Sequence, residues 1–302
     1  MATETQQSLQ LPELKGCEHL HIQLHDGFIH LASMGNGQPV LLLPGWGQSW
    51  WEWREVMPAL ASAGYRALAL DLRGEGWSRL PIAAISRTQR AQDLLELIDI
   101  MQLDSVTVVG HDLGAIAAYQ VAFDRPQRIR RLAMLAVPPP QMKFDLALLP
   151  GLRHLWHQEA LAIPGLGRKL MSSGFMCRHF YSDVFLTRKL SPEVVAQYDA
   201  LMRHPATARA AELICRRIVL PELMRIMAGT YRRQRLSMPT KFVFGSKDTG
   251  FPAKVLHSVF AAPEKIGPDA SLGLISGAGH FLVDEEPAAV ARVLLEFLAE
   301  TP

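Results

Sequence analysis

The residue of this chain best suited to chemistry is Asp112, which lies in the segment VVGHDLGA, residues 108–115. The spacing Gly-x-nucleophile-x-Gly after an apolar run is typical of a sharp strand-to-helix turn that exposes a nucleophile, most often a serine. An aspartate with the ordinary pKa of about 3.9 is already ionised at neutral pH and needs no base before it attacks. A carboxylate is readily expelled from carbonyl adducts, but it forms a stable ester with saturated carbon. Asp112 therefore predicts displacement at an sp3 carbon, as in an epoxide or an alkyl halide.

Two later loops hold residues that could hydrolyse such an ester. His280, in SGAGHF, is predicted to take a proton from the water that attacks the carboxyl carbon of Asp112. Asp248, in FGSKD, is predicted to hold the imidazole in the right tautomer and to stabilise its protonated form. The backbone N–H groups of Trp46 and Leu113 are the expected donors to the oxyanion that forms on Asp112.

An alternation of strands and helices must position these loops. Continuous apolar runs predict buried strands, and apolar residues at helical spacing predict helices between them. After three early strands within 19–45, the predicted strands are 65–71, 105–109, 129–137, 240–248 and 270–280, and the predicted helices are 49–64, 86–103, 113–123, 252–260 and 287–300. This order indicates an α/β fold, with a mainly parallel sheet, helices on both faces and ligands beyond the carboxyl ends of the strands. We expect residues 1–137 and 239–302 to form this core and residues 138–238 to form a helical insertion.

Five segments together resemble the α/β-hydrolase superfamily, and within it the epoxide hydrolase and haloalkane dehalogenase branch. They are PGWGQSWWEWR, DLRGEGWS, GHDLGA, FGSKD and SGAGHF, and the resemblance extends from about residue 20 to residue 298. The chain order nucleophile, acid, base also matches this superfamily. With PGLGRKL added, the chain is most similar to bacterial epoxide hydrolases. The resemblance implies the α/β-hydrolase fold with a helical lid, and opening of an epoxide to a vicinal diol through an ester on Asp112.

The resemblance also implies a proton donor in the lid, where relatives usually place two tyrosines. Tyr231, in GTYRRQ, matches the second of them, and His157, in LWHQEALAIPGLG, stands in the place of the first. Trp46, Trp156, His157 and Tyr231 are the expected substrate contacts. A further departure is Gly47, because relatives usually read His-Gly-x-Pro where this chain has Pro-Gly-Trp-Gly.

Two other functions stay open at this point. A hydrolytic dehalogenase would use the same nucleophile, but many haloalkane dehalogenases carry a tryptophan where this chain has Leu113, and fluoroacetate dehalogenases hold their substrate with arginine around the turn. The second alternative is a catalytically reduced member of the fold that binds a hydrophobic small molecule. Each residue also has a plain structural interpretation: Asp112 could favour a helix N-terminus, Asp248 could cap a helix, and His280 could lie on the surface.

Several other polar and aromatic side chains are expected to be structural. The set comprises His111, which should point into the fold, Asp71 and Arg73, which should fix their own loop, and Trp50, Trp51, Trp53, Tyr181 and Tyr198, which should pack against neighbouring elements.

The composition is that of an ordinary soluble enzyme. Apolar residues make up 49% and charged residues 20%, and the net charge of +2 is too small to indicate a nucleic-acid partner. Three widely spaced cysteines indicate neither a disulfide framework nor a zinc site, and we expect no metal or cofactor. A polar start and the absence of long apolar runs predict no signal peptide, no membrane span and a cytoplasmic protein. The expected partners are a small apolar substrate and water, and the sequence makes no prediction of the oligomeric state.

Overall fold

The computed structural model describes residues 9–142 and 155–300, and its centre is an eight-stranded sheet. The strand order is β1-β2-β4-β3-β5-β6-β7-β8. Strand β2 runs antiparallel to β1 and β4, and all pairs from β4 to β8 are parallel. The strands are β1 Glu18–Leu24, β2 Gly27–Met34, β3 Gln38–Leu43, β4 Tyr65–Leu70, β5 Val106–His111, β6 Ile129–Leu135, β7 Thr240–Gly245 and β8 Ala270–Ile275. The predicted mainly parallel α/β sheet is confirmed.

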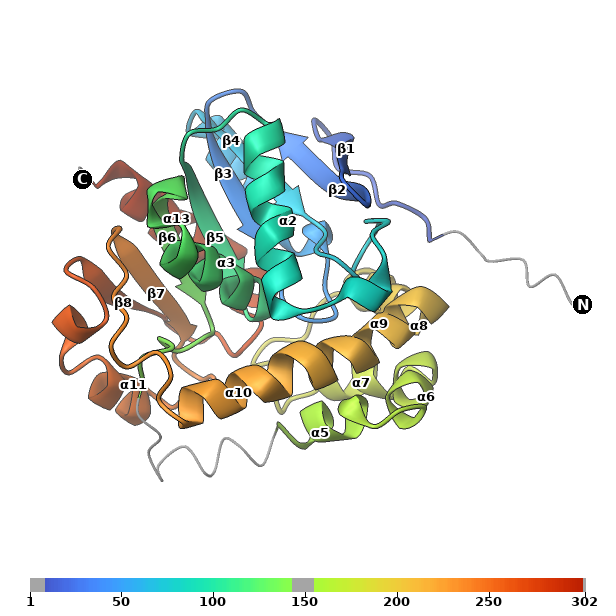
Figure 1. Cartoon of the computed structure of the whole chain (residues 1–302). Helices are drawn as coiled ribbons and strands as arrows, with labels where there is room; N and C mark the ends of the chain where they lie inside the picture. Colours follow the sequence, from blue (N-terminus) through green and yellow to red (C-terminus); the bar gives the residue numbers. More distant parts are fainter. Residues whose placement is uncertain (1–8, 143–154, 301–302) are drawn as a thin grey trace, which may run out of the picture.

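Helices cover both faces of this sheet (Figure 1), which explains why its central strands are continuously apolar. Helices α2 (Arg87–Ile100) and α3 (Leu113–Asp124) pack on one face, where Leu97 and Ala118 are fully buried. Helices α1 (Val56–Ser62) and α13 (Pro287–Ala299) pack on the other face, through Leu60 and Phe297 among others. The shorter elements are η2 Ile82–Ala84, η3 Pro126–Arg128, α11 Ala253–Val259, η7 Pro263–Lys265 and α12 Leu282–Glu285.

The helix predicted over residues 49–64 is wrong in one respect, because it is two elements. A 3₁₀ turn, η1 (Trp50–Trp53), comes first, and α1 begins at Val56. The Ser49 side chain accepts a hydrogen bond from the Trp51 N–H, and the Trp50 N–H donates to Asp71 Oδ1 at 2.8 Å. This long-range bond from Asp71 fixes the turn, and Trp50 is fully buried in the core as expected.

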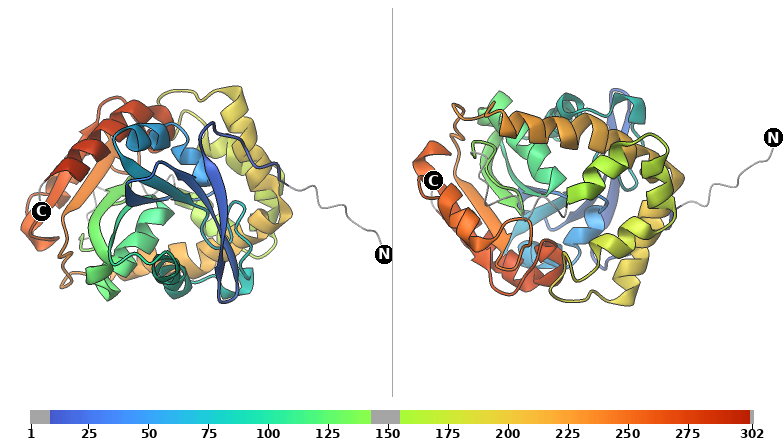
Figure 2. Two further views of the ribbon diagram at one scale, coloured as in Figure 1. Left: turned by 90° about the horizontal axis from the view of Figure 1, so that it is seen from above. Right: turned by 90° about the horizontal axis from the view of Figure 1, so that it is seen from below.

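Between β6 and β7 the described chain is helical. It lies below the sheet in Figure 1 and faces the viewer in the right-hand panel of Figure 2, which is seen from below. Its helices are α5 Trp156–Ala162, α6 Leu166–Ser172, α7 Phe175–Phe180, α8 Pro192–Arg203, α9 Pro205–Ile214 and α10 Leu220–Met227. A π-helix, Cys215–Val219, joins α9 to α10, so the helix continues past Pro221. A proline lacks an N–H and crowds the preceding turn, and a widened π turn accommodates both effects. Within the described ranges, no helix is long and apolar enough to cross a membrane.

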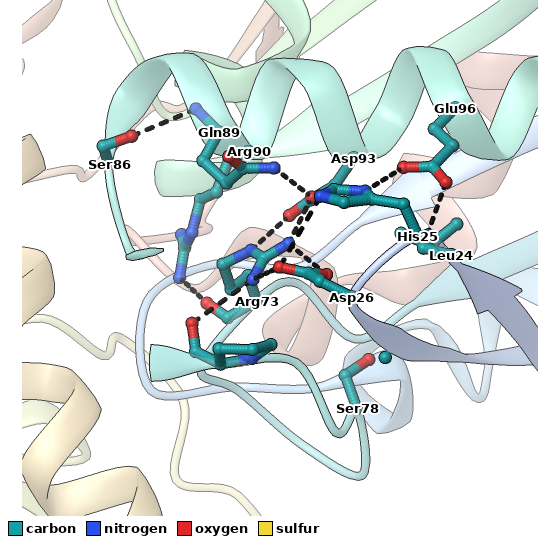
Figure 3. A network of polar contacts seen from close by, with 12 residues as sticks. Leu24, His25, Asp26, Arg73, Ser78, Ser86, Gln89, Arg90, Asp93 and Glu96 are labelled. Carbon is teal, nitrogen blue, oxygen red and sulfur yellow. Dashed lines mark hydrogen bonds and ion pairs between the residues drawn. The ribbon is translucent and has the colours of Figure 1, made fainter. Parts of the chain in front are cut away.

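Arg73 fixes the loop after β4 to two distant elements (Figure 3). Its guanidinium group is fully buried and bonds both carboxylate oxygens of Asp93 on α2, at 2.8 and 2.6 Å. It also bonds both carboxylate oxygens of Asp26, in the turn between β1 and β2, at 2.9 and 3.0 Å. A planar guanidinium group suits this double pairing, and the structural role expected for Arg73 is therefore observed.

Candidate active site

Asp112 lies at the sharp turn between β5 and α3. Its backbone φ is +43°, a value that side chains other than glycine seldom adopt. The turn brings the chain close to β3, because a Cβ atom on Gly114 would lie 2.4 Å from the carbonyl oxygen of Leu43. Glycine is thus required at residue 114, and the tight turn leaves the Asp112 carboxylate at the end of the sheet, facing a cavity.

The loop after β3 places a backbone donor on this carboxylate. The N–H of Trp46 donates to Asp112 Oδ2 at 3.1 Å. The loop closes as a turn in which the Gln48 N–H donates to the Gly45 carbonyl oxygen at 3.1 Å. Gly47 has a φ of +72°, and no cis peptide occurs in the described residues, so a left-handed glycine shapes this loop. The loop presents the Trp46 N–H where negative charge would build up on Asp112.

His280 and Asp248 come together from the ends of β8 and β7. His280 Nδ1 lies 3.0 Å from Asp248 Oδ2, and the second Asp248 oxygen accepts the Gly250 N–H at 2.8 Å. Burial alone would lower the pKa of His280, but the Asp248 carboxylate raises it above the ordinary value, and Asp112 contributes in the same direction. The imidazole is therefore oriented by Asp248 and lies close enough to Asp112 to sense its charge.

A buried ion pair includes His111, the residue before Asp112. His111 Nδ1 lies 2.7 Å from Glu52 Oε1, and His111 Nε2 lies 3.0 Å from the backbone oxygen of His280. The other Glu52 oxygen accepts the Gly45 N–H at 2.8 Å. Burial favours neutral His111, but Glu52 outweighs it and raises the pKa of His111 to about 9. His111 points into the fold, as expected, and connects the loops that hold Asp112, His280 and Trp46.

These groups open onto one apolar cavity of about 200 Å³. Six of the predicted site residues are among those that line it: Trp46, Asp112, Leu113, His157, Asp248 and His280. Most of the remaining lining is apolar, and it includes Ile116, Phe180 and Phe185. His157 is buried and makes edge-on ring contacts with Phe180 and Phe185, at 4.9 and 5.9 Å between ring centroids. The fold thus brings together the predicted nucleophile, base, acid, backbone donors and lid histidine.

Tyr231 and Trp156, which are also expected to contact substrate, are not among the described residues that line the cavity. The Tyr231 hydroxyl donates to Glu222, and its ring stacks on Phe123 at 5.7 Å. Tyr231 therefore belongs to the packing beneath the lid and is not among the described residues that line the cavity. Trp156 is 42% exposed on α5 and contacts Phe175 instead.

Comparison with known proteins agrees with this architecture. The family model of the alpha/beta hydrolase fold matches residues 38–287. The chain belongs to the α/β-hydrolase family. A soluble epoxide hydrolase from Corynebacterium sp. (strain C12) is 27% identical over 289 residues, which cover 92% of this chain and 96% of the relative. The ligand-free structure of the epoxide hydrolase CorEH, 26% identical, superposes with a TM-score of 0.80 over 94% of this chain and 99% of that one.

A third similarity concerns the fold alone. The epoxide hydrolase VrEH1 from Vigna radiata is 24% identical and superposes with a TM-score of 0.78 over 95% of this chain and 99% of that one. It agrees with the family match in showing the α/β-hydrolase fold that the sequence motifs predict.

One residue of this α/β-hydrolase that lines the cavity was not foreseen from the sequence. Glu222, on α10, is buried, and its Oε1 atom accepts hydrogen bonds from both Tyr119 and Tyr231. Its Oε2 atom lies 3.3 Å from Arg225 Nη1 and 3.8 Å from Arg87 Nε. The only signal in the sequence is an acidic residue directly after Pro221, which gives no hint of its three-dimensional partners.

The arrangement can support covalent chemistry on a carboxylate. The α/β-hydrolase presents a carboxylate, a backbone donor bonded to it, and an imidazole oriented by a second carboxylate, all facing one apolar cavity. This set can form an ester and activate a water molecule. Across residues 9–142 and 155–300, no group of three or more His, Cys, Asp and Glu side chains is placed to hold a metal ion.

Proposed function

We propose that this protein hydrolyses a small apolar epoxide to a vicinal diol through an alkyl ester on Asp112. The observation that carries the proposal is the Trp46 N–H on Asp112 Oδ2, in a cavity that also holds the His280–Asp248 pair. The epoxide hydrolases among its relatives support the same reaction.

In the first step an oxygen of Asp112 attacks one carbon of the epoxide ring. The carbon–oxygen bond of the ring breaks as the ester bond forms, and the departing oxygen takes a proton. With Oδ2 bonded to Trp46, we assign the attack to Oδ1. We assign the proton to His157, because this imidazole lines the cavity whereas the Tyr231 hydroxyl is bonded to Glu222. An imidazole can donate a proton near neutral pH, which a tyrosine in the same place does less readily.

In the second step water attacks the carboxyl carbon of the ester. His280 takes a proton from this water, and Asp248 stabilises the imidazolium that results. The negative charge on the former carboxyl oxygen is met by the Trp46 N–H and by the Leu113 N–H at the start of α3. Loss of one such donor typically raises a barrier by about 2.7–4 kcal/mol. The tetrahedral adduct then breaks its bond to the former Oδ1 oxygen, which takes the remaining proton of the attacking water and leaves as part of the diol. Asp112 is left as a carboxylate with one oxygen from solvent, and the proton on His280 passes through solvent to restore the one that His157 gave up.

The lining of the cavity favours an epoxide over a halogenated acid or an alkyl halide. Three carboxylates line it, those of Asp112, Glu222 and Asp248, and no lysine or arginine is among the described lining residues. A substrate carboxylate would therefore be repelled. A halide leaving group needs N–H donors, but the residue after Asp112 is Leu113, whose side chain supplies none. Hydrolytic dehalogenation remains the second candidate because it uses the same nucleophile and base.

Trapping of the ester tests the proposal. In His280→Gln the first step can proceed and the second is blocked, so styrene oxide should add its whole mass to the protein, at a peptide that contains Asp112. A 1-haloalkane would add only its alkyl group, because the halide departs. Addition by the epoxide alone supports the proposal, and addition by the haloalkane alone assigns the protein to the dehalogenases.

Two controls make the result decisive. The double variant His280→Gln/Asp112→Asn should take up neither compound, since it lacks the nucleophile. If His280→Gln itself takes up none of a panel of epoxides and haloalkanes while the protein is folded by circular dichroism, the covalent mechanism is refuted and a binding role for the cavity takes its place.

A further inference from the structure

Asp284, four residues after the base His280, joins three parts of the molecule. Its side chain is fully buried on α12. Oδ1 lies 2.6 Å from Arg54 Nη1, next to the Trp46 loop. Oδ2 accepts a hydrogen bond from Gln48 Nε2 at 2.8 Å. The Tyr198 hydroxyl, from α8 of the lid, lies 3.1 and 2.9 Å from the two oxygens.

Gln48 connects this carboxylate to the proposed oxyanion donor. The Gln48 N–H closes the turn that begins at Gly45, and the Trp46 N–H inside this turn bonds Asp112. A Cβ atom on Gly47 would lie 2.8 Å from the terminal carbon of Met202, which like Tyr198 belongs to α8. The Trp46 loop is therefore held from one side by Asp284 and packed from the other by the lid helix that Asp284 also holds.

Tyr198 is the residue through which the lid contacts Asp284. It is fully buried, and its ring stacks on Tyr181 with 5.1 Å between centroids and 10° between planes. Among the described residues the Tyr181 hydroxyl is buried without a hydrogen-bond partner, so only one of the two stacked phenols bonds the carboxylate. Tyr198 is not among the described residues that line the cavity, so we do not count it among the substrate contacts.

The next residue, Glu285, ties the lid to the base by a separate route. Its Oε2 accepts the Thr187 N–H at 2.7 Å, and its Oε1 accepts the Gly279 N–H at 3.0 Å. The His280 N–H in turn donates to the Phe185 carbonyl oxygen at 3.0 Å. Two adjacent carboxylates thus hold the lid at two places, and of the two, Asp284 is the one bonded to the Trp46 loop through Gln48.

We propose that Asp284 is a positioning residue that couples the seating of the lid helix α8 to the placement of the Trp46 N–H on Asp112. Where α8 lies in place, the Tyr198 hydroxyl completes the hydrogen bonds of Asp284, and the carboxylate then holds Gln48 and the turn that contains Trp46. Where α8 moves away, Asp284 loses that donor and the turn loses both its packing and part of its anchor. The catalytic consequence rests on the proposed function, whereas the coupling itself does not.

Hydrogen exchange tests the coupling without reference to activity. Tyr198→Phe removes the hydroxyl and keeps the stacked ring, and Tyr181→Phe is its matched control. We expect Tyr198→Phe to speed exchange at least threefold both in peptides of α8 and in peptides that cover residues 44–49, and Tyr181→Phe to leave both within experimental error. Faster exchange in α8 alone, or in neither segment, would overturn the proposal.

The variant Glu285→Gln distinguishes coupling through Asp284 from a general loosening of the lid. It should speed exchange around residues 185–190 and 277–281 while residues 44–49 stay protected, because Glu285 does not contact the Trp46 loop. Equal loosening of residues 44–49 in Glu285→Gln and Tyr198→Phe would contradict a specific role for Asp284.

Kinetics then tests the catalytic consequence. With an epoxide that labels His280→Gln, Tyr198→Phe in the otherwise wild-type protein should slow hydrolysis of the ester about tenfold in a single turnover, because the Trp46 N–H meets the negative charge that forms in this step. Tyr181→Phe should change this rate less than twofold. If the exchange result holds and no epoxide labels the protein, the proposed function fails while the coupling stands. If the epoxide labels His280→Gln and Tyr198→Phe hydrolyses the ester at an unchanged rate, the coupling has no catalytic role.

Discussion

Tyr231 donates its phenolic hydrogen to Glu222, and the residue that reaches the cavity is Glu222 rather than Tyr231. Tyr119, from α3 in the core, donates to the same carboxylate oxygen. Both tyrosines thus donate to one carboxylate oxygen, although Tyr231 follows α10 in sequence and Tyr119 lies on α3, and Tyr231 also accepts a hydrogen bond from Arg87 Nη1 at 3.2 Å. The shared acceptor provides a matched pair of variants for the identity of the proton donor.

We expect Tyr231→Phe and Tyr119→Phe to behave alike. Each removes one donor to a buried carboxylate and should lower the free energy of unfolding by about 1–3 kcal/mol. Neither should change kcat/KM for an epoxide more than threefold, whereas His157→Phe should lower kcat at least tenfold. Urea unfolding and steady-state kinetics measure the two effects. A large loss of kcat confined to Tyr231→Phe would show that this tyrosine leaves Glu222 and protonates the substrate.

The hydrolytic step should have an acid limb set by His280. The base must be neutral to accept a proton from water, and Asp248 raises the pKa of His280 above its ordinary value against the effect of burial. The rate of ester hydrolysis should therefore fall as the pH drops through a value above about 6.5. In Asp248→Asn the limb should move to lower pH and the maximal rate should fall. Single-turnover decay of the ester, measured from pH 5 to 9, checks both; an unmoved limb would contradict the assignment of Asp248.

The buried Glu52–His111 pair should make stability depend on pH in the alkaline range. The pKa of His111 in the folded protein is about 9, and that of an unfolded histidine is about 6.5. A raised pKa means that the pair stabilises the fold fully below pH 6.5 and loses this effect as the pH rises through 9. The expected loss between pH 6.5 and 10 is on the order of 2–3 kcal/mol.

Urea unfolding at several pH values measures this loss. In Glu52→Gln the slope attributable to His111 should largely disappear. His257→Gln, at an exposed histidine, should keep the wild-type slope. A wild-type slope in Glu52→Gln would mean that another group titrates.

Arg73→Lys should destabilise the fold without altering the reaction. A lysine keeps the charge but cannot bond both oxygens of Asp93 and of Asp26, which leaves buried acceptors with fewer partners. We expect a loss of about 2 kcal/mol or more in the free energy of unfolding. Arg128→Lys, at an ion pair with the exposed Asp99, should cost less than about 1 kcal/mol. Both variants should keep wild-type KM, and a change of KM in Arg73→Lys would show that this loop reaches the cavity.

The spacing of apolar residues predicted those helices and strands whose formation depends mainly on the residues within them. The helix expected at 113–123 is α3, Leu113–Asp124, and the strand expected at 65–71 is β4, Tyr65–Leu70, because each reflects the periodicity of its own residues. The loops that hold Asp112, Asp248 and His280 could also be located, since parallel strands bring their carboxyl ends to one edge. The break inside 49–64 could not, because it depends on Asp71, which lies beyond the helix.

The partners of buried charges were beyond prediction for the same reason. Glu222 contacts Tyr119, 103 positions earlier, and Asp284 contacts Gln48, 236 positions earlier. Their roles depend on how the lid folds back over the core. The placement of Tyr231 follows from this, because its motif shows that a tyrosine is present and not which carboxylate binds it. Similarity to a motif therefore located the turn that holds Asp112 and did not reveal the hydrogen-bond partner of Tyr231.

The backbone of Asp112 has a consequence for how this protein could change over generations. A non-glycine residue at a φ of +43° carries local strain that typically costs about 1–3 kcal/mol. Glycine at residue 112 would relieve it, so an inactive Asp112→Gly chain should melt at a higher temperature than the active one. Selection for stability alone would favour glycine at residue 112. On the proposed function, this strain is a cost in stability that the chemistry of Asp112 requires.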